Sequence, residues 1–402
     1  MFKISLTASL FFGALAGYLA PEFCVYLKPL GDLFLNLILT AAIPLIFFSI
    51  ASVVANNSNS RLNKIFISIA IVFLLCSLWA AVEALLVMVS FSSFIETNFT
   101  LNTIYENTNS NSGLIENRNP LININLINLL SVKKFTDLFS HEHILALILF
   151  SILVGYASRK TDFCKFLTTG NLVTTRLLQI ILYFSPIGFF SYFAVLIQSI
   201  GKQFISLYIG IALMYYIFSV FYFITTYSSY AYVASRKQGI IKFWKNISGS
   251  LTVSMATCSS VASIPSNLQI AKLIGVERDI YQTCIPIGAI IHKQGSIIGS
   301  VFKIMFLFKV YNYNFSSLNI WLITILISVL TGIIIGAFPG GGMLGEVFIV
   351  SVYGFDPSAL LSITAISILI DPAATMLNVS GNITTAMLVE RVRNCIDRFV
   401  SK

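Results

Sequence analysis

The chain has 402 residues, of which 57% are hydrophobic and only 10% are charged. A soluble domain carries about 25% charged residues, so this composition excludes an ordinary water-exposed globular domain. The formal net charge is +9, but the Lys and Arg residues gather in short loops, as they do in the cytoplasmic loops of membrane proteins. The expected surroundings are therefore a lipid membrane and not a nucleic acid.

The polar residues form no pattern typical of an enzyme or a metal site. The six cysteines are scattered and include no Cys-x-x-Cys pair, which argues against a disulfide framework and against zinc. His141 and His143 lie near the start of an apolar run with no Cys, Asp or Glu array beside them. No Ser/His/Asp set stands out either. We therefore expect neither an enzyme nor a bound cofactor.

Apolar runs long enough to cross a hydrocarbon core about 30 Å thick recur along the chain, which predicts an all-α membrane protein. The expected plain spans lie near residues 4–20, 30–56, 64–95, 144–157, 172–200 and 203–234, and further apolar segments at 246–275, 279–309, 318–354 and 357–390. Residues 96–134 are rich in Asn and predict an exposed loop between the third and fourth spans.

Two of the later segments are interrupted by small residues and proline. The run 246–275 is interrupted at 255–265 by a stretch rich in Ser and Ala that ends in Pro265. The run 318–354 is interrupted at 336–342 by a stretch rich in Gly and Pro. Such backbone must be buried in protein or line a cavity when it lies inside a membrane. Paired interruptions of this kind point to the binding site of a transporter and predict two re-entrant helical hairpins. The alternative is a pair of ordinary spans with kinks.

Charged residues inside apolar spans need a reason, because each one is costly to insert. Such residues are Glu83, His292, Lys293, Glu346 and Asp371. Asp371 also opens a polar stretch in which Thr375, Asn378 and Asn382 follow at intervals of three or four, so these side chains share one face of a helix. A polar stripe of this kind indicates a cavity, or alternatively hydrogen bonds between helices.

Five motifs in a fixed order resemble the dicarboxylate/amino acid:cation symporter family, which includes glutamate transporters and neutral amino acid exchangers. They run along essentially the whole chain: residues 27–34 followed by 43–48, residues 185–188, the serine-rich tip ending at Pro265, residues 338–342, and residues 371–381. The resemblance implies eight transmembrane helices plus two re-entrant hairpins, in a glutamate-transporter-like elevator fold. It also implies a homotrimer in the cell (inner) membrane with both termini cytoplasmic.

The same resemblance implies a division of the chain into a scaffold and a mobile transport unit. Residues 1–245 mainly form scaffold spans one to six, of which the third and sixth lie partly in the transport unit. The core of the transport unit is expected at 246–390, with the first hairpin at 246–275, the seventh span at 279–309, the second hairpin at 318–354 and the eighth span at 357–390. Residues 391–402 are expected to be a cytoplasmic tail.

The expected substrate site is carried over residue by residue. Asp371 matches the family's aspartate that binds the substrate's amino group, and Thr375 and Asn378 match polar residues of the same pocket. Pairing of a carboxylate with an ammonium, and of backbone amides with an anion, makes chemical sense. The serines of the first tip are Ser259 and Ser260, and the second gate is matched by Ala337, Phe338, Gly340 and Gly342.

Two departures from the family bear on the substrate. The arginine that gives acidic selectivity in the last helix is replaced by Ala374, and its alternative position in the first tip is Cys258. A side-chain carboxylate would then lack its bidentate partner. We therefore expect a small or medium neutral amino acid as the substrate.

The cation sites depart further. The family's Asn-Met-Asp-Gly-Thr reads His292, Lys293, Gln294, Gly295 and Ser296 here. A last-helix aspartate has become Asn382, and a Thr-Ser pair has become Cys76 and Ser77, while Gly288 and Asn378 could still offer oxygen. Since the negative charge is gone, we do not expect strong sodium binding at these positions.

Lys293 indicates what replaces sodium. Its ammonium could supply a fixed positive charge, with Asp371 or Glu83 as the partner, or Lys293 and His292 could bind and release a proton. Two versions therefore stay open, a cation-independent exchanger and a proton-coupled carrier. The rivals are a conventional sodium- or proton-coupled dicarboxylate or glutamate symporter, and a non-transporting sensor or anion channel on the same fold.

Overall fold

The computed structural model describes residues 2–56, 63–90, 131–140, 143–200, 202–311, 313–337 and 342–400, and its regular structure within those ranges is helical throughout. The first part contains α1 (Phe2–Leu19), α2 (Pro21–Asn56), α3 (Asn63–Ser90), the short helix η2 (Phe135–Phe139), α7 (Ile144–Ala157), α8 (Phe163–Tyr183), α9 (Ser185–Ile200) and α10 (Lys202–Asn246). The second part contains α11 (Ser248–Thr257), α12 (Ile264–Ile274), α13 (Arg278–Ile291), α14 (Gln294–Val310), α15 (Leu318–Ala337), α16 (Gly342–Tyr353) and α17 (Ala359–Val400). The all-α class is confirmed.

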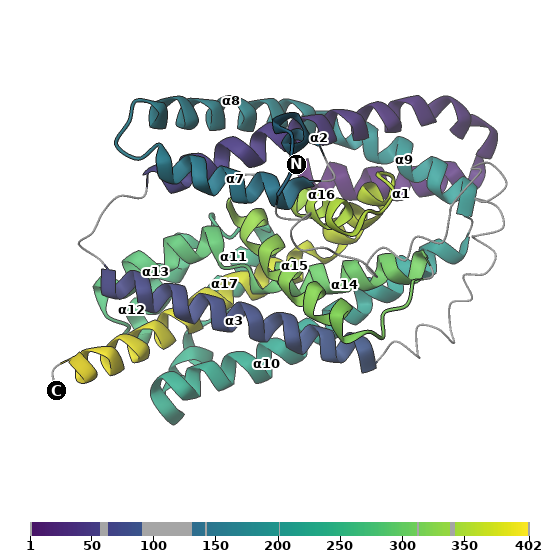
Figure 1. Cartoon of the computed structure of the whole chain (residues 1–402). Coiled ribbons are helices and arrows are strands. Elements are labelled where there is room, and N and C mark those ends of the chain that lie inside the picture. Colours follow the sequence, from purple (N-terminus) through teal and green to yellow (C-terminus); the bar gives the residue numbers. More distant parts are fainter. Residues whose placement is uncertain are drawn as a thin grey trace.

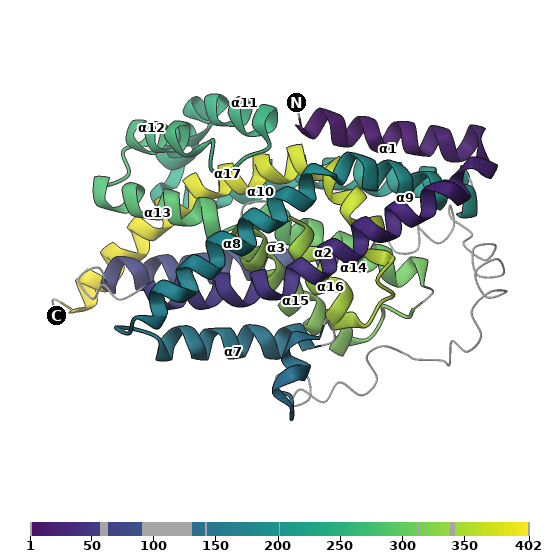
Figure 2. The ribbon, with the colours of Figure 1, turned by 90° about the horizontal axis from the view of Figure 1, so that it is seen from above.

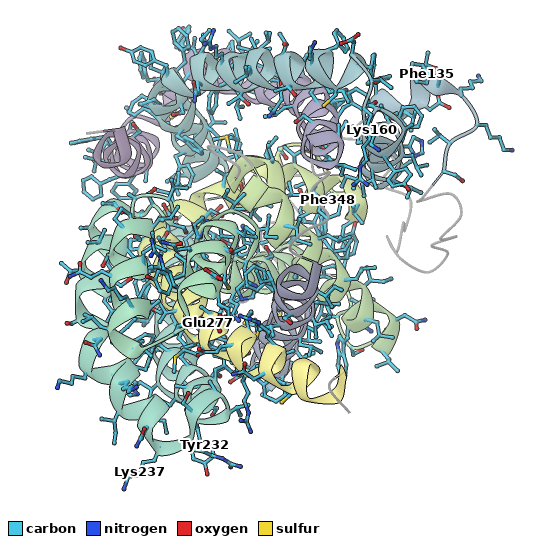
Figure 3. The ribbon with its side chains drawn as sticks, turned by 90° about the vertical axis from the view of Figure 1, so that its left-hand side faces the viewer. Phe135, Lys160, Tyr232, Lys237, Glu277 and Phe348 are labelled. Atoms are coloured by element: carbon cyan, nitrogen blue, oxygen red, sulfur yellow. The ribbon has the colours of Figure 1, made fainter. Side chains whose placement is uncertain are left out.

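The helices pack in two groups (Figure 1). One group, the outer layer, consists of α1, α2, α7, α8 and α9, and Figure 2 shows α8, α2 and α9 running across the rest of the molecule. The other group, the helical body, consists of α3 and α10 to α17. In Figure 3 Lys160, after α7, lies in the outer layer and Tyr232 of α10 at the far side of the body, with Phe348 of α16 between them. The helix α16 contacts both groups, since it packs on α2 and α7 as well as on α15 and α17.

Four helices in the described ranges are long and apolar enough to cross a membrane. They contain the segments Ile67–Ser90 in α3, Leu207–Asn246 in α10, Leu318–Ile335 in α15 and Ala359–Cys395 in α17. The pair α8 and α9 would count as a fifth span, whereas α7 and α16 are apolar but shorter.

The span expected at 172–200 is not one straight helix. It consists of α8 and α9, which meet at a bend of 53°. The bend falls just before Pro186, and proline disfavours helical backbone in the residue that precedes it. A proline inside the first turn of α9 is itself well tolerated, because that turn needs no N–H donor there.

The first interrupted segment forms a pair of short helices, α11 and α12, which pack on each other. They are joined by a turn at residues 258–263, where Cys258 adopts the left-handed conformation with φ of 45°. Asn267 of α12 ties the pair together, because its side chain accepts a hydrogen bond from Ser250 of α11 and donates one to the Val379 carbonyl of α17, at 2.9 Å. The expected hairpin at 246–275 thus has two arms fixed on α17.

The expected seventh span, 279–309, is interrupted in its middle. The helix α13 ends at Ile291 and α14 begins at Gln294. Between them His292 has extended backbone angles, and Lys293 has angles that are neither helical nor extended. Two long polar side chains follow each other at this break, and the end of α13 is closed by a bond from the His292 N–H to the Gly288 carbonyl at 3.0 Å. The run therefore behaves as two half-helices and not as a single rod.

Three other expectations differ at their boundaries. The helix α10 continues past 234 to Asn246, but with non-helical angles at Ser235 and Arg236. The helix α17 passes through Pro372 and reaches Val400, so residues 391–400 of the expected tail are helical. The exposed loop expected at 96–134 lies outside the described residues except for its last four positions.

Candidate functional site

The polar stripe of α17 faces the start of α14. The Thr375 hydroxyl donates to the Asp371 carboxylate at 3.2 Å, which places these two side chains one turn apart on one face. The Asn378 side chain accepts a bond from the Ser296 N–H at 3.3 Å and donates to the Ser296 hydroxyl at 3.1 Å. The first N–H groups of a helix lack partners within it. Asn378 of the neighbouring helix α17 therefore supplies the hydrogen-bond acceptor for one of these N–H groups of α14.

The backbones of α14 and α17 touch at this point. A Cβ atom on Gly295 would overlap the carbonyl oxygen of Ala374, so only glycine allows this approach. The Gly295 carbonyl accepts a hydrogen bond from the Tyr215 hydroxyl of α10 at 2.8 Å. Ala374, at the position of the family's arginine, is 6% exposed. The break before α14 is thus held between α10 and α17.

The tip of the first hairpin is stabilised by its own hydroxyl groups. The Ser259 N–H donates to the Thr257 hydroxyl, and the Ser259 hydroxyl accepts from the Ala262 N–H, both at 3.2 Å. Ser260 is buried. The Tyr216 hydroxyl lies within electrostatic range of both Cys258 and Asp371, which brings this tip close to the aspartate of α17.

The second tip is described only at its ends. Ala337 is the last residue of α15 and Gly342 is the first of α16. Phe338 and Gly340 lie outside the described residues. A Cβ atom on Gly342 would meet no atom within 4 Å, so the start of α16 borders open space.

The expected coupling residues of α3 and the α13–α14 break come together. The imidazole ring of His292 is fully buried and stacks on the Phe73 ring, with centroids 4.3 Å apart and planes 15° apart. Its Nδ1 atom lies 3.4 Å from the Ser77 hydroxyl. Cys76, beside Ser77, is also buried. These contacts join residues that are far apart in the sequence.

Two buried amide side chains, Gln294 of α14 and Asn382 of α17, have no hydrogen-bond partner in the described part of the chain. A Cβ atom on Gly288 would lie 2.6 Å from Asn382 Oδ1, so α13 and α17 also approach closely here. The His292 Nε2 atom likewise lacks a partner within the described ranges. Buried polar groups are nearly always satisfied. Such a cluster therefore indicates a place for water or a small polar species.

Lys293 follows the histidine and is 9% exposed. The opposite charge that acts on its ammonium is the Asp371 carboxylate. Glu83, the other candidate partner, instead accepts hydrogen bonds from Thr226. Of the two partners that the sequence allowed for Lys293, Asp371 is therefore the one whose charge acts on its ammonium.

Comparison with known proteins identifies the family of this chain. The sequence profile of the sodium:dicarboxylate symporter family matches residues 2–392. The chain belongs to this family. It is 23% identical to the proton/sodium-glutamate symport protein of Bacillus subtilis, over 97% of this chain and 93% of that protein. It is 22% identical to the serine/threonine transporter SstT of Acinetobacter baylyi, over 97% of this chain and 98% of that protein.

A human relative, neutral amino acid transporter A, is 25% identical over 60% of this chain and 46% of its own length. The relatives are transporters and not enzymes, in agreement with the sequence prediction. The chain is thus a multi-pass membrane transporter of the sodium:dicarboxylate symporter family, whose members carry dicarboxylates, glutamate or neutral amino acids.

The side chains of this symporter-family chain do not fit a strong sodium site at the expected positions. Sodium prefers hard oxygen ligands with negative charge among them, as other hard cations do. Gln294 and Asn382 offer only neutral amide oxygens, and the residue before Gln294 in the chain is the cationic Lys293. No group of three His, Cys, Asp or Glu side chains that could hold a metal occurs in the described ranges.

The sequence identifies Glu346 as an intramembrane charge but does not predict its buried partner, Lys303. The Lys303 ammonium of α14 lies 2.8 Å from the Glu346 carboxylate of α16, and both are buried. The hydroxyl of Ser367 on α17 accepts from Lys303 at 2.8 Å and donates to Glu346 at 2.5 Å. The sequence signal that could have predicted this pair is a second charge, Lys303, inside an apolar run, with Glu346 inside another. The pair joins three helices of the body.

Proposed function

We propose that this symporter-family chain is a secondary active transporter of small or medium neutral amino acids that does not use the family's sodium sites. The observation that carries the proposal is that the Asp371 carboxylate is the opposite charge acting on the Lys293 ammonium, together with unpartnered neutral amides at Gln294 and Asn382 within the described ranges. The positive charge of Lys293 takes the place of a bound cation, because it neutralises the negative charge of Asp371 without an ion from solution.

The substrate class follows from the charges around Asp371. Its carboxylate, ordered by Thr375, suits the ammonium group of an amino acid. The position where the family carries an arginine is the small, buried Ala374, which offers no fork of donors for a second carboxylate. Backbone N–H groups at the first tip and at the start of α16 are candidates for the substrate's α-carboxylate.

The wider architecture is proposed on the same grounds. Family membership over residues 2–392 and the two groups of helices support eight spans, two re-entrant hairpins and an elevator motion of the transport unit against the scaffold. The proposal includes a homotrimer in the cell (inner) membrane, with both termini cytoplasmic. The domain limits are those expected above, 1–245 for the scaffold and 246–390 for the transport unit, with the helical end of α17 after them.

A dicarboxylate carrier is the second candidate, and one observation favours it. The Lys293 ammonium lies near Asp371 and could pair with the second carboxylate of an acidic substrate. In that case aspartate or a C4-dicarboxylate should be bound more tightly than serine or alanine. The Lys293→Met variant should then lose transport of the acidic substrate only.

The deciding experiment is counterflow of labelled serine, alanine and aspartate in proteoliposomes that contain the full chain. It is run with sodium, without sodium and with an imposed pH gradient. We expect serine or alanine flux in the absence of sodium, and its loss in the Lys293→Met variant. The exposed Lys165, which pairs only with Asp162 on the surface, provides the matched control as Lys165→Met.

Other outcomes assign the chain differently. Flux that requires sodium would overturn the sodium-independent mechanism. Substrate binding without flux would indicate a sensor, and substrate-gated current far above carrier turnover would indicate an anion channel. Flux unaffected by Lys293→Met would remove the role of this ammonium.

A further inference from the structure

Glu83 is a carboxyl group inside a membrane span. It lies in the apolar segment Ile67–Ser90 of α3, seven residues before the end of the helix. At a rise of 1.5 Å per residue this is about 10 Å from the end. A charged side chain at such a depth is costly and marks an ion or proton pathway by default.

The surroundings of Glu83 supply hydrogen bonds but no cation. The Thr226 hydroxyl of α10 lies 3.0 and 3.2 Å from the two carboxyl oxygens, and the Trp79 indole is a second donor one turn earlier. No Lys, Arg or His of the described ranges pairs with Glu83. By contrast, the carboxylate of Glu346 has Lys303 at 2.8 Å. Glu83 is half-buried, and a negative charge on it therefore lacks the counter-ion that the fully buried Glu346 has.

A line of hydroxyl groups leads from Glu83 into the helical body. We call it the hydroxyl stripe, and it consists of one face of α10 with members spaced three or four apart: Tyr215, Ser219, Tyr222, Thr226 and Tyr230. Its far end is the Tyr215 hydroxyl, which donates to the Gly295 carbonyl at 2.8 Å. Side chains at this spacing share one helical face. The stripe thus runs from the acid toward the start of α14, and the Ser219, Tyr222 and Tyr230 hydroxyls in it have no hydrogen-bond partner within the described ranges.

Another residue of α10, Tyr227, lies close to the unpartnered amide side chain of Gln294. A Cβ atom on Gly381 would lie 2.7 Å from Gln294 Oε1 and 2.8 Å from the Tyr227 hydroxyl, so these two groups meet at one point. Tyr222 and Tyr227 are the titratable side chains of α10 that are within electrostatic range of Glu83. The helices α13, α14, α15 and α17 also pack on α3, and in the described ranges none of them places a charged group on this carboxyl.

We propose that Glu83 is a proton-binding site of the carrier and that its proton is the coupling ion. The carboxylate takes a proton from water on one side of the membrane and returns it to water on the other, with no change in any other bond. Once protonated, Glu83 can donate to Thr226 instead of accepting from it. The Thr226 hydroxyl is then able to donate to another acceptor. The inference rests on the proposed amino acid transport and names its coupling.

The test uses the full chain in proteoliposomes, with a serine gradient as the driving force and a pH-sensitive dye in the lumen. The variants are wild type, Glu83→Gln, which mimics the neutral acid, and the control Glu22→Gln, which alters an exposed glutamate of α2. We expect serine-driven proton flux in wild type and in Glu22→Gln. In Glu83→Gln we expect that flux to fall at least tenfold, while serine counterflow stays within about twofold.

Each other result has a defined meaning. Proton flux that survives in Glu83→Gln overturns the inference. Wild-type counterflow without any proton flux also overturns it but leaves sodium-independent exchange standing. If no neutral amino acid is transported, the proposed function fails, and the proton site is then tested by itself with pH-difference infrared spectroscopy of the purified protein.

The spectroscopic arm needs no transport. Wild type should show a carboxylic acid band that titrates with pH and is missing from Glu83→Gln. Should that variant not fold, Thr226→Val keeps the acid and removes its hydroxyl partner. The band and its pH midpoint should then shift relative to wild type, and an unchanged spectrum would overturn the inference.

Discussion

The charged side chains inside the spans of this membrane protein have two kinds of surroundings. Lys303 and Glu346 neutralise each other at 2.8 Å and are joined by the Ser367 hydroxyl, so their charges are satisfied within the protein. Glu83 has hydroxyl and indole partners only. The first arrangement is suited to fixing helices, whereas the second is suited to exchanging a proton with water.

Breaking the fixed pair should therefore cost stability. Removal of one partner leaves an unpaired buried charge, and we expect Lys303→Met or Glu346→Gln to destabilise the fold by about 3–5 kcal/mol. The double variant Lys303→Met/Glu346→Leu should recover most of this loss, because no charge is left. Thermal unfolding in detergent, followed by tryptophan fluorescence, measures both. A double variant as unstable as the single ones would contradict this account.

The sequence predicts the α17 stripe well and its partners poorly. Polar residues three or four apart in an apolar run must share a face, and the bond between Thr375 and Asp371 confirms that relation. Which distant residue meets which cannot be read from spacing, as the contact of Ser77 with His292 shows. The roles of these side chains in binding stay predictions.

At the scale of elements, the α13–α14 break is the main departure from the expected spans. Hydropathy treats residues 279–309 as one run, because His292 and Lys293 are outnumbered by apolar neighbours. The backbone is interrupted there because the surrounding helices supply hydrogen bonds to the ends, from Asn378 to the Ser296 N–H and from Tyr215 to the Gly295 carbonyl. Such support depends on packing, which a local pattern does not contain.

This packing makes Gly295 sensitive to a single added methyl group. In Gly295→Ala the new Cβ atom overlaps the Ala374 carbonyl, and forcing atoms into a filled space destabilises by about 1–3 kcal/mol. The matched control is Gly249→Ala, also at the second residue of a helix, where the nearest atom is 3.9 Å away. We expect a lower unfolding temperature and reduced counterflow for the first variant only. Equal behaviour of the two would contradict the close approach.

At the scale of the whole molecule, α10 and α17 behave as one unit within the helical body. Three tyrosines of α10 donate to main-chain carbonyls of α17: Tyr208 to Ser362, Tyr216 to Leu369 and Tyr227 to Leu377, at 3.0, 3.1 and 2.7 Å. Contacts between the body and the outer layer are few by comparison and involve α16, α17 and the start of α10. The molecule is thus divided along the boundary between these two groups.

Loss of these hydroxyl groups should loosen the body without changing its shape. Each hydrogen bond contributes about 0.5–1.5 kcal/mol, so Tyr208→Phe/Tyr227→Phe should lose about 1–3 kcal/mol if the two sites are independent. Tyr232→Phe is the control, because that ring is on the exposed face of α10. Thermal unfolding and hydrogen exchange of α17 measure the effect. A stability of the double variant equal to that of the control would contradict the role of these bonds.

The acceptors on α17 in these three bonds are carbonyl oxygens, which every amino acid carries. These three bonds therefore do not depend on which side chains their acceptor residues carry, although the Tyr227 hydroxyl leaves no room for a Cβ atom at Gly381. Substitutions in the polar stripe of α17 can thus occur without removing the bonds. A lineage can in this way exchange an arginine for an alanine, or an aspartate for an asparagine, and keep its folded carrier through the intermediate steps. Hydrogen bonds to the main chain thus allow the substrate specificity of such a protein to change while the two helices stay attached.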